Sequence, residues 1–276
     1  MIKKYLTKIL WYVGRNTRIH SINRILLEKL YKDLIAERDK KNSFNLVKFG
    51  FKVYSQNDED GIIDEIFNRI GIKNKSFIEL GVQNGLECNT TFLLVSGWRG
   101  LWIDMSTNKK IIEKNFSNFY NKRLFFKQKK ITKENVNSLL GEHIDFVSED
   151  VDLLSIDLSR NTYHILNKIN ICKPRVIVAE YNAKLRDKIQ WECDYDENLE
   201  WDGSDQFSAS LKSFELMLNK KNYYLVGCNI TGVNAFFVRK DLINEKFLKN
   251  YSSEAHYEEF KGWLIKKFEN EIKIKI

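Results

Sequence analysis

Phe77-Ile-Glu-Leu-Gly-Val-Gln-Asn-Gly-Leu-Glu-Cys-Asn-Thr90 is the stretch that decides the fold. Its apolar run stops at Glu79-Leu-Gly81 and turns through Gly85, which predicts a strand, a tight loop and the start of a helix. The glycines adopt dihedral angles that a side chain forbids, and they let the backbone approach a ligand closely. A second predicted strand, Gly100-Leu-Trp-Ile-Asp104, ends in an acid 25 residues after Glu79. This combination indicates a nucleoside-binding turn in a doubly wound sheet, with Asp104 accepting both ribose hydroxyls.

The spacing of the glycines distinguishes between cofactor classes. A nicotinamide dinucleotide site uses G-x-G-x-x-G, which places the pyrophosphate on a helix N-terminus. The chain instead has Glu79-x-Gly81-x-x-x-Gly85, and an acid before the first glycine suits a cationic ligand without phosphates. Class I methyltransferases have this pattern and hold S-adenosylmethionine at this turn. Taken alone, the loop is also compatible with a tight strand–helix turn that binds nothing.

Alternating strand and helix patterns from residue 46 onward predict a parallel sheet with right-handed crossovers. Two further strand-like runs, 223–229 and 233–239, are joined by a short turn containing Gly232, which predicts a hairpin. We therefore predict an α/β fold of the Rossmann-like class I methyltransferase type: a mostly parallel seven-stranded sheet with a C-terminal antiparallel hairpin, plus N-terminal helices. The parallel strands are expected at 76–80, 100–104, 124–128, 152–157 and 175–180.

Basic residues are concentrated in the first part of the chain. Residues 1–41 hold eleven Lys or Arg against four acids, which accounts for +7 of the formal net charge of +8. Apolar residues there recur at helical spacing, which predicts two amphipathic helices. They could pack on the domain or on a second subunit, bind an anionic membrane surface or contact a partner enzyme. We predict a basic helical extension at 1–45, a methyltransferase domain at 46–242 and a helical tail at 243–276. The nearly neutral body argues against nucleic-acid binding.

Cysteine usage and hydropathy indicate a compartment. Four cysteines without C-x-x-C spacing favour reduced, buried thiols rather than disulfides or structural zinc. No run of 18 apolar residues is present, and the N-terminus lacks the cleavage site of a secretory signal. We expect a cytoplasmic protein, with residues 1–41 contacting the inner face of the membrane as an alternative to homo-oligomer formation.

Between residues 50 and 242 the chain resembles the FkbM-like S-adenosylmethionine-dependent methyltransferases. Seven motifs carry the resemblance, in the order in which that family has them. They are Tyr54-Ser-Gln-Asn-Asp-Glu-Asp-Gly61, Phe77-Ile-Glu-Leu-Gly81, Glu87-Cys-Asn-Thr90, Gly100-Leu-Trp-Ile-Asp104, Asp152-Leu-Leu-Ser-Ile-Asp157, Val178-Ala-Glu-Tyr-Asn182 and Gly232-Val-Asn-Ala-Phe-Phe-Val-Arg239. Enzymes of this family are associated with O-methylation of sugars, glycolipids or secondary metabolites.

The resemblance implies a set of S-adenosylmethionine ligands. Glu79, Gly81, Gly85 and Asp104 would form the cofactor turn, and the loop from Gln128 to Thr132 would contact adenine. Gln56, with Ser55 and Glu59, lies in a segment expected to fold over the methionine end. The alternative for that segment is helix capping, because Ser55 or Asn57 could satisfy free N–H groups of a helix at Ile62–Ile70.

Chemistry is expected at the carboxyl ends of the central strands. Asp157 ends the fourth predicted strand, and Glu180 with Asn182 ends the fifth. A carboxylate there could take the proton of a hydroxyl that is being methylated. Alternatively, Asp157 and Glu180, with Asn182, could supply oxygen ligands to Mg²⁺. Strand-end acids can also serve only as helix caps.

The chain departs from the family where Ile156-Asp-Leu-Ser-Arg-Asn-Thr-Tyr163 replaces Ile-Asp-Ile-Asp-Gly-Asn-Asp-Tyr. Two acids are lost, which weakens a multi-carboxylate metal site. Arg160 could pair with an anionic substrate or lie solvated at a helix start. His164, one turn further along, is a weaker candidate base.

A long irregular stretch, 183–206, carries the candidate substrate residues Trp191, Trp201 and Asp205. Aromatic faces stack on sugar rings and carboxylates accept sugar hydroxyls, which predicts a substrate lid, with a packed surface insertion as the alternative. We expect an O-methyltransferase acting on a sugar hydroxyl of a surface glycan, nucleotide sugar or lipid-linked precursor. A non-catalytic scaffold of the same fold is the alternative, and RNA ribose methylation is a lesser one.

Overall fold

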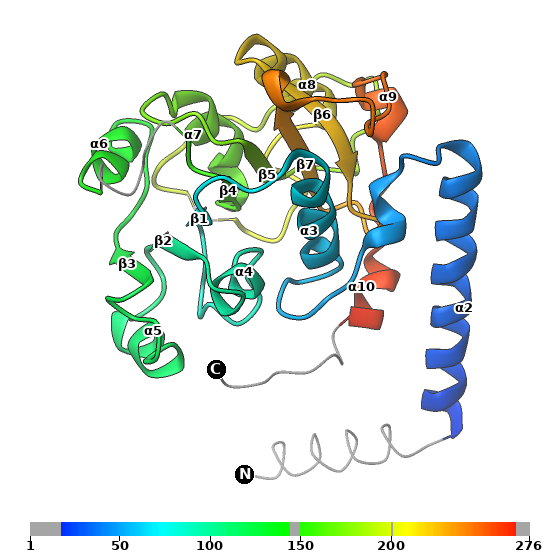
Figure 1. Cartoon of the computed structure of the whole chain (residues 1–276), viewed down its shortest axis with the longest axis horizontal. Coiled ribbons are helices and arrows are strands. Elements are labelled where there is room, and N and C mark those ends of the chain that lie inside the picture. The colour runs from blue at the N-terminus through cyan, green and yellow to red at the C-terminus, as the bar shows by residue number, and fades with distance from the viewer. Residues whose placement is uncertain (1–17, 144–149, 200, 269–276) are drawn as a thin grey trace.

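The computed structural model describes residues 18–143, 150–199 and 201–268 (Figure 1). Within these ranges seven strands form one sheet in the order β3-β2-β1-β4-β5-β7-β6. The first five strands pair in parallel, and β7 runs antiparallel to both β5 and β6. This confirms the predicted fold class. The strands are β1 Ser76–Leu80, β2 Arg99–Asp104, β3 Leu124–Gln128, β4 Leu153–Ile156, β5 Val176–Glu180, β6 Tyr223–Cys228 and β7 Asn234–Arg239.

Helices cover both faces of the sheet because successive side chains of each buried strand point to opposite faces. On β1, Ile78 packs in a cluster with residues of α6, α7 and α8, whereas Phe77 packs with residues of α3, α4 and α5. These helices are α3 Glu59–Ile70, α4 Thr91–Val95, α5 Lys109–Asn115, α6 Val136–Gly141, α7 Thr162–Lys168 and α8 Leu211–Lys220. The remaining elements are α2 Arg18–Lys41, α9 Ser253–His256, α10 Gly262–Phe268 and the short 3-10 helices η1 Leu46–Phe49, η2 Ser159–Asn161 and η3 Lys240–Leu242.

The N-terminal extension contributes one long described helix. Of the two predicted helices, the second corresponds to α2, and the first lies outside the described residues. The C-terminal half of α2 packs on the body, with Leu34 and Ile35 against Val47 and Leu264. The first part of the predicted apolar stripe does not pack on the body. There the side chains of Ile22, Ile25, Leu26 and Leu30 are exposed.

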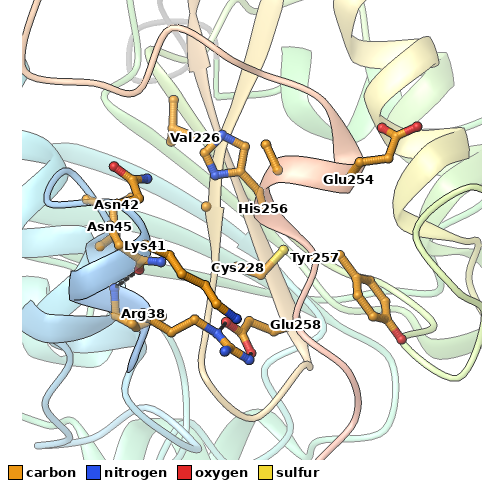
Figure 2. Close-up of a pocket in the computed structure, with 14 residues that line it drawn as sticks. Arg38, Lys41, Asn42, Asn45, Val226, Cys228, Glu254, His256, Tyr257 and Glu258 are labelled. Carbon is orange, nitrogen blue, oxygen red and sulfur yellow. Dashed lines mark hydrogen bonds and ion pairs between the residues drawn. The ribbon is translucent and has the colours of Figure 1, made fainter. Parts of the chain in front are cut away.

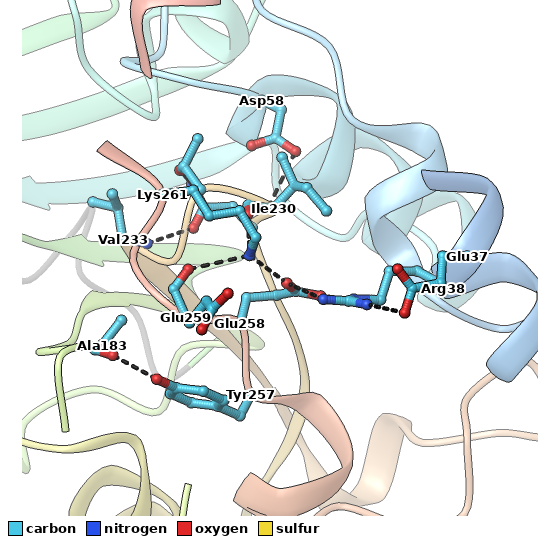
Figure 3. A network of polar contacts seen from close by, with 12 residues as sticks. Glu37, Arg38, Asp58, Ala183, Ile230, Val233, Tyr257, Glu258, Glu259 and Lys261 are labelled. Atoms are coloured by element: carbon cyan, nitrogen blue, oxygen red, sulfur yellow. Dashed lines mark hydrogen bonds and ion pairs between the residues drawn. The ribbon is translucent and has the colours of Figure 1, made fainter. Parts of the chain in front are cut away.

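A polar network joins α2 to the segment before α10 (Figure 3). Glu258 is buried and accepts two hydrogen bonds from Arg38, with Nε at 2.5 Å and Nη2 at 3.1 Å. Its Oε2 also accepts from Lys261 Nζ at 2.8 Å, and the same Nζ donates to the backbone oxygen of Ile230 at 3.1 Å. The α2 helix and the 258–261 segment are therefore fixed to the β6–β7 turn.

All four cysteines are free and buried, as the sequence predicts for reduced thiols. None of the helices in the described ranges has both the length and the apolar character that a membrane crossing requires.

Candidate functional site

The principal candidate site is a cavity of about 360 Å³ at the carboxyl ends of β1, β2, β3 and β4. The strand order reverses between β1 and β4, and open α/β sheets bind ligands at such a switch point. The loop that follows each of these four strands contributes to the wall. Its residues are Gly81, Gln83, Asp104, Met105, Ser106, Lys129, Lys130, Ile131, Asp157, Leu158, Ser159, Arg160, Asn161, Ile165, Glu197, Leu199 and Trp201.

Both glycines of the first turn adopt positive φ, +87° at Gly81 and +78° at Gly85. The atoms that lie against these two glycines belong to the protein itself, whereas the sequence predicted a ligand there. A Cβ at Gly81 would lie 1.8 Å from the backbone oxygen of Asp157, and one at Gly85 would lie 2.7 Å from the indole of Trp102. Gly81 also lines the cavity, whereas Gly85 does not. Close packing within the protein therefore requires glycine at both positions, and Gly81 alone is placed to approach a ligand.

Glu79 holds the loop after β1 in place rather than facing the cavity. Its buried carboxylate accepts hydrogen bonds from Asn89 N at 3.0 Å, Thr90 N at 3.1 Å, Thr90 Oγ1 at 2.5 Å and Ser155 Oγ at 3.2 Å. Burial raises the pKa of Glu79 to about 7, against the lowering effect of these donors. Its role in the described structure is to connect the 89–90 turn to β4.

Asp104 lines the cavity, but its carboxylate oxygens already have donors. Oδ2 accepts from Val82 N at 2.8 Å and Gln83 N at 2.9 Å. Oδ1 accepts from Ser106 N and Ser106 Oγ, both at 2.7 Å, and from Thr107 N at 3.1 Å. Asp104 thus joins the loops after β1 and β2, and ribose hydroxyls would have to compete with these donors.

The loop after β3 reaches the cavity through Lys129, Lys130 and Ile131. Gln128, the residue named for adenine contact, does not line it. Its exposed side chain accepts a hydrogen bond from Lys109 N at 3.3 Å. The predicted loop is therefore at the cavity, and the residues that face it directly follow Gln128.

Asp157 and Glu180 lie side by side at the ends of β4 and β5, which pair in parallel register. Asp157 is exposed and lines the cavity. Glu180 keeps partial exposure through other atoms, but its Oε2 is buried and has no hydrogen-bond partner. Burial, together with the charge of Asp157 and a hydrogen bond to it, raises the pKa of Glu180 well above its usual range. Glu180 therefore keeps its proton to a higher pH than an ordinary glutamate does.

Asn182 is buried and directs its side chain to the lid segment. Its Nδ2 donates to the backbone oxygen of Asp205 at 2.8 Å, and its Oδ1 accepts from Lys184 N at 3.2 Å. Asp205 is itself exposed and forms an ion pair with Lys184. Neither Asn182 nor Asp205 lines the cavity.

Of the predicted lid aromatics, Trp201 lines the cavity and Trp191 does not. Trp201 is 52% exposed, and its Nε1 donates to Ser204 O at 2.6 Å. Trp191 accepts a backbone hydrogen bond from Ser210 N at 2.9 Å, away from the cavity wall. The structure thus brings together one aromatic ring, Asp157 and the glycine turn after β1 at a single cavity.

Residues of η2 and α7 anchor the lid. Asn161 Nδ2 donates to Asp196 O at 2.9 Å, and Asp196 N donates to Asn161 Oδ1 at 3.3 Å. The His164 imidazole Nε2 lies 2.6 Å from Cys193 O. These contacts give His164 a structural partner in place of the base role considered for it.

The segment containing Gln56 has capping geometry. Ser55 Oγ accepts from Asp60 N at 3.2 Å in the first turn of α3, and Asp60 Oδ2 accepts three backbone N–H groups from 53–55. Glu59 accepts from Asn229 and Asn234 of the β6–β7 turn, both at 2.9 Å. Gln56 is exposed and does not line the cavity. This supports the capping interpretation and leaves contact with the methionine end untested.

The residues at the strand ends do not fit Mg²⁺. Two carboxyl groups, Asp157 and Glu180, meet there, and the amide of Asn182 is turned to the lid. Within the described ranges no group of three or more His, Cys, Asp or Glu could hold a metal ion. We therefore derive no metal-assisted step.

A second cavity of about 230 Å³ lies between α2, β6 and the 254–258 segment (Figure 2). Its cations are already paired, Arg38 with Glu258 and Lys41 with Glu37. Burial lowers the pKa of His256 to about 4, so the imidazole is neutral near pH 7, and its Nε2 lies 2.7 Å from Asn250 O. This cavity belongs to the contact between α2 and the body.

Among known proteins, the chain is similar to several solved structures. The chain is similar to an O-methyltransferase family protein from Burkholderia thailandensis, at 9% identity and a TM-score of 0.39, covering 66% of this chain and 58% of that one. It is also similar to an S-adenosylmethionine-dependent methyltransferase from Clostridium acetobutylicum, at 13% identity and a TM-score of 0.39, covering 68% of this chain and 92% of that one. The chain therefore spans little more than half of the Burkholderia protein. No family model and no curated protein matches it.

Sequence reasoning placed the loop that contains Lys129 and Lys130 at the cofactor without naming either lysine, and it left Arg160 as either a partner for an anionic substrate or a solvated residue. Each of these cations follows a predicted strand within a few residues. Their position shortly after the carboxyl end of a strand could therefore have identified Lys129, Lys130 and Arg160 as cavity residues.

Proposed function

We propose that the protein is an S-adenosylmethionine-dependent O-methyltransferase. The observation that carries the proposal is the cavity at the β1/β4 switch point, where the Gly81 turn, Asp104 and Asp157 meet in a sheet with a reversed β7. Gly81, Gln83 and Asp104 would hold the nucleoside, with Ile131 against the base. When bound, S-adenosylmethionine supplies the methyl group from its sulfonium.

Asp157 is the residue that would act on the acceptor. It is exposed in the cavity, so it can accept a hydrogen bond from an acceptor hydroxyl, orient it and take its proton. The pKa of Glu180 is raised well above its usual range, and Glu180 hydrogen-bonds Asp157, which holds that carboxylate in place. Trp201 offers an aromatic face at the cavity for a sugar ring, which supports a sugar hydroxyl as the acceptor.

The second candidate is a non-catalytic scaffold with this fold. The hydrogen bonding of Asp104 favours it, because both carboxylate oxygens are already used by the loops after β1 and β2. A chain that no longer binds a nucleoside would keep such contacts for stability.

We also propose a cytoplasmic location at the inner face of a membrane. The support is the exposed apolar group on α2 together with the charge of +7 in residues 1–41. An enzyme held there would meet lipid-linked sugar precursors.

The deciding experiment is calorimetric titration of the purified chain with S-adenosylmethionine, S-adenosylhomocysteine and, separately, NAD. We expect binding of the first two and none of NAD, and loss of binding in Asp104→Ala, whose fold is checked by circular dichroism. Binding of none of the three would favour the scaffold. Binding of NAD alone would overturn the proposal.

A further inference from the structure

The charged residues of the switch-point cavity differ in how many hydrogen bonds and ion pairs they already make. Asp104 accepts hydrogen bonds at both carboxylate oxygens, and Asp157 is hydrogen-bonded to Glu180. Arg160, Lys129 and Lys130 also line the cavity, and no ion pair within the described residues includes any of the three. Glu197 is the one lining acid with neither a hydrogen bond nor an ion pair among the described residues, so the three cations outnumber it at this site.

Arg160 is the clearest case. Its Nε is buried and has no hydrogen-bond partner, and its Nη1 makes one long bond of 3.4 Å to the backbone oxygen of Gln206. A guanidinium presents several N–H donors in a planar fork that matches a carboxylate or phosphate. A buried donor without a partner costs free energy, which a bound oxyanion would recover.

The backbone beside Arg160 is fixed to the chain after the predicted lid. Ser159 has φ +50°, and its backbone oxygen accepts from Ser208 N at 3.1 Å. Asp202 is an exposed acid of the predicted lid, and its pKa is lowered by hydrogen bonds from Ser204 and, to a smaller extent, by the charge of Arg160. No ion pair joins Asp202 and Arg160 among the described residues, and Arg160 lines the cavity together with Trp201.

We propose that Arg160 binds an oxyanion, a phosphate or carboxylate, carried by the acceptor substrate, with Lys129 and Lys130 adding positive charge. This proposal rests on the proposed function, because it takes the oxyanion to be part of the methyl acceptor. The acceptor would then be an acidic or phosphorylated sugar rather than a neutral one. The other source of the same chemistry is the carboxylate of the cofactor's methionine part.

The experiment measures binding of glucose 1-phosphate, glucuronate and neutral glucose by calorimetry, to wild type and to Arg160→Gln. We expect the two anions to bind and glucose not to, and Arg160→Gln to weaken the anions about tenfold or more. Arg160→Lys keeps the charge without the fork and should lose less. Arg24→Gln, which removes an exposed arginine of α2, is the matched control and should bind as wild type does.

A second arm separates the two sources. S-adenosylhomocysteine has the methionine-type carboxylate, and 5′-methylthioadenosine lacks it. If Arg160 serves the acceptor, Arg160→Gln binds both as wild type does. Selective loss of S-adenosylhomocysteine would assign Arg160 to the cofactor and overturn the proposal.

The two proposals fail in different ways. Wild type that binds S-adenosylhomocysteine but neither anion refutes the oxyanion site and leaves the methyltransferase proposal standing. Wild type that binds the anions through Arg160 but no adenosyl ligand refutes the methyltransferase and leaves an oxyanion site. An unchanged melting temperature in Arg160→Gln shows that lost binding is not unfolding.

Discussion

At the level of single residues, Asp157 and Glu180 are neighbours with different surroundings. Asp157 is exposed in the cavity, and Glu180 has a buried, unpartnered oxygen. We expect Asp157→Asn to lower methyl transfer about 100-fold or more, because the amide cannot take a proton. Glu180→Gln should retain most activity, since the raised pKa of Glu180 favours its neutral form, which the amide resembles. Initial rates with a fixed acceptor test this, and equal losses in both variants would contradict it.

Glu180 also makes stability depend on pH. Its pKa in the folded chain is raised by burial and by Asp157, so the unfolded chain releases this proton at lower pH than the folded chain does. Wild type therefore loses stability as pH rises from about 4.5 toward the folded value. Glu180→Gln lacks this loss, so its melting temperature relative to wild type should be higher at pH 8 than at pH 5. Melting curves that shift in parallel would show that the side chain is not buried as a neutral acid.

At the level of elements, the turn after β1 packs directly on the end of β4. A Cβ at Gly81 would lie 1.8 Å from Asp157 O, whereas Gly203 has a similar φ of +86° and no atom within 4 Å of its Cβ position. Gly203→Ala should cost about 1 kcal/mol from backbone strain. Gly81→Ala should cost about 3 kcal/mol beyond that, because the clash displaces β4. Urea unfolding measures both, and equal costs would rule out the close approach.

The contact between α2 and the C-terminal segment depends on Arg38 and Glu258, whose side chains are 21% and 4% exposed. Arg38→Ala should lower the free energy of unfolding by about 2 kcal/mol, because Glu258 stays buried with Lys261 as its remaining cation. Arg186→Ala is the control. Arg186 is 71% exposed and 3.7 Å from exposed Glu259, so its loss should cost less than about 0.5 kcal/mol. Similar values for the two variants would mean that the Arg38 pair is not a structural link.

At the level of the whole molecule, α2 lies along one side of the body (Figure 1). Leu34 and Ile35, near its C-terminal end, pack on the body, whereas Ile22, Leu26 and Leu30, each four residues apart and nearer its start, share an exposed face. Residues 1–17, outside the described ranges, add four basic residues and no acid. The combination suits an anionic lipid surface.

We expect the chain to cosediment with phosphatidylglycerol vesicles at low salt and to bind poorly to neutral vesicles or at high salt. Changing Ile25 and Leu26 to Ser together should weaken binding about tenfold or more. Ile72→Ser, at an exposed isoleucine away from α2, should have no effect. A stable dimer in light scattering that needs Ile25 and Leu26, without vesicle binding, would instead assign this face to a second copy.

Much of the fold was predictable because it depends on local pattern. The predicted starts and ends of the five parallel strands agree with the structure to within one residue. Strand-end residues were placed correctly as a group, since parallel strands present their carboxyl ends at one edge, and Gly81, Asp104 and Asp157 do share a cavity. The position of β7 between β5 and β6 is a choice of pairing that a hairpin pattern leaves open.

The hydrogen-bond partners and the pKa of each polar group could be assigned only from the folded structure. Asp104 is bonded by N–H groups from two loops, and Asn182 is bonded to the lid 23 residues away. The pKa of Glu180 is raised because burial and Asp157, which follows another strand, act on it together. The strand ranges, the acids at strand ends and the basic extension follow from residue pattern, because periodicity and charge are properties of the chain itself. Which acids are used up, which is protonated and which cation is unpaired follow only from three-dimensional contacts, because hydrogen bonding and desolvation depend on neighbours that are distant in sequence.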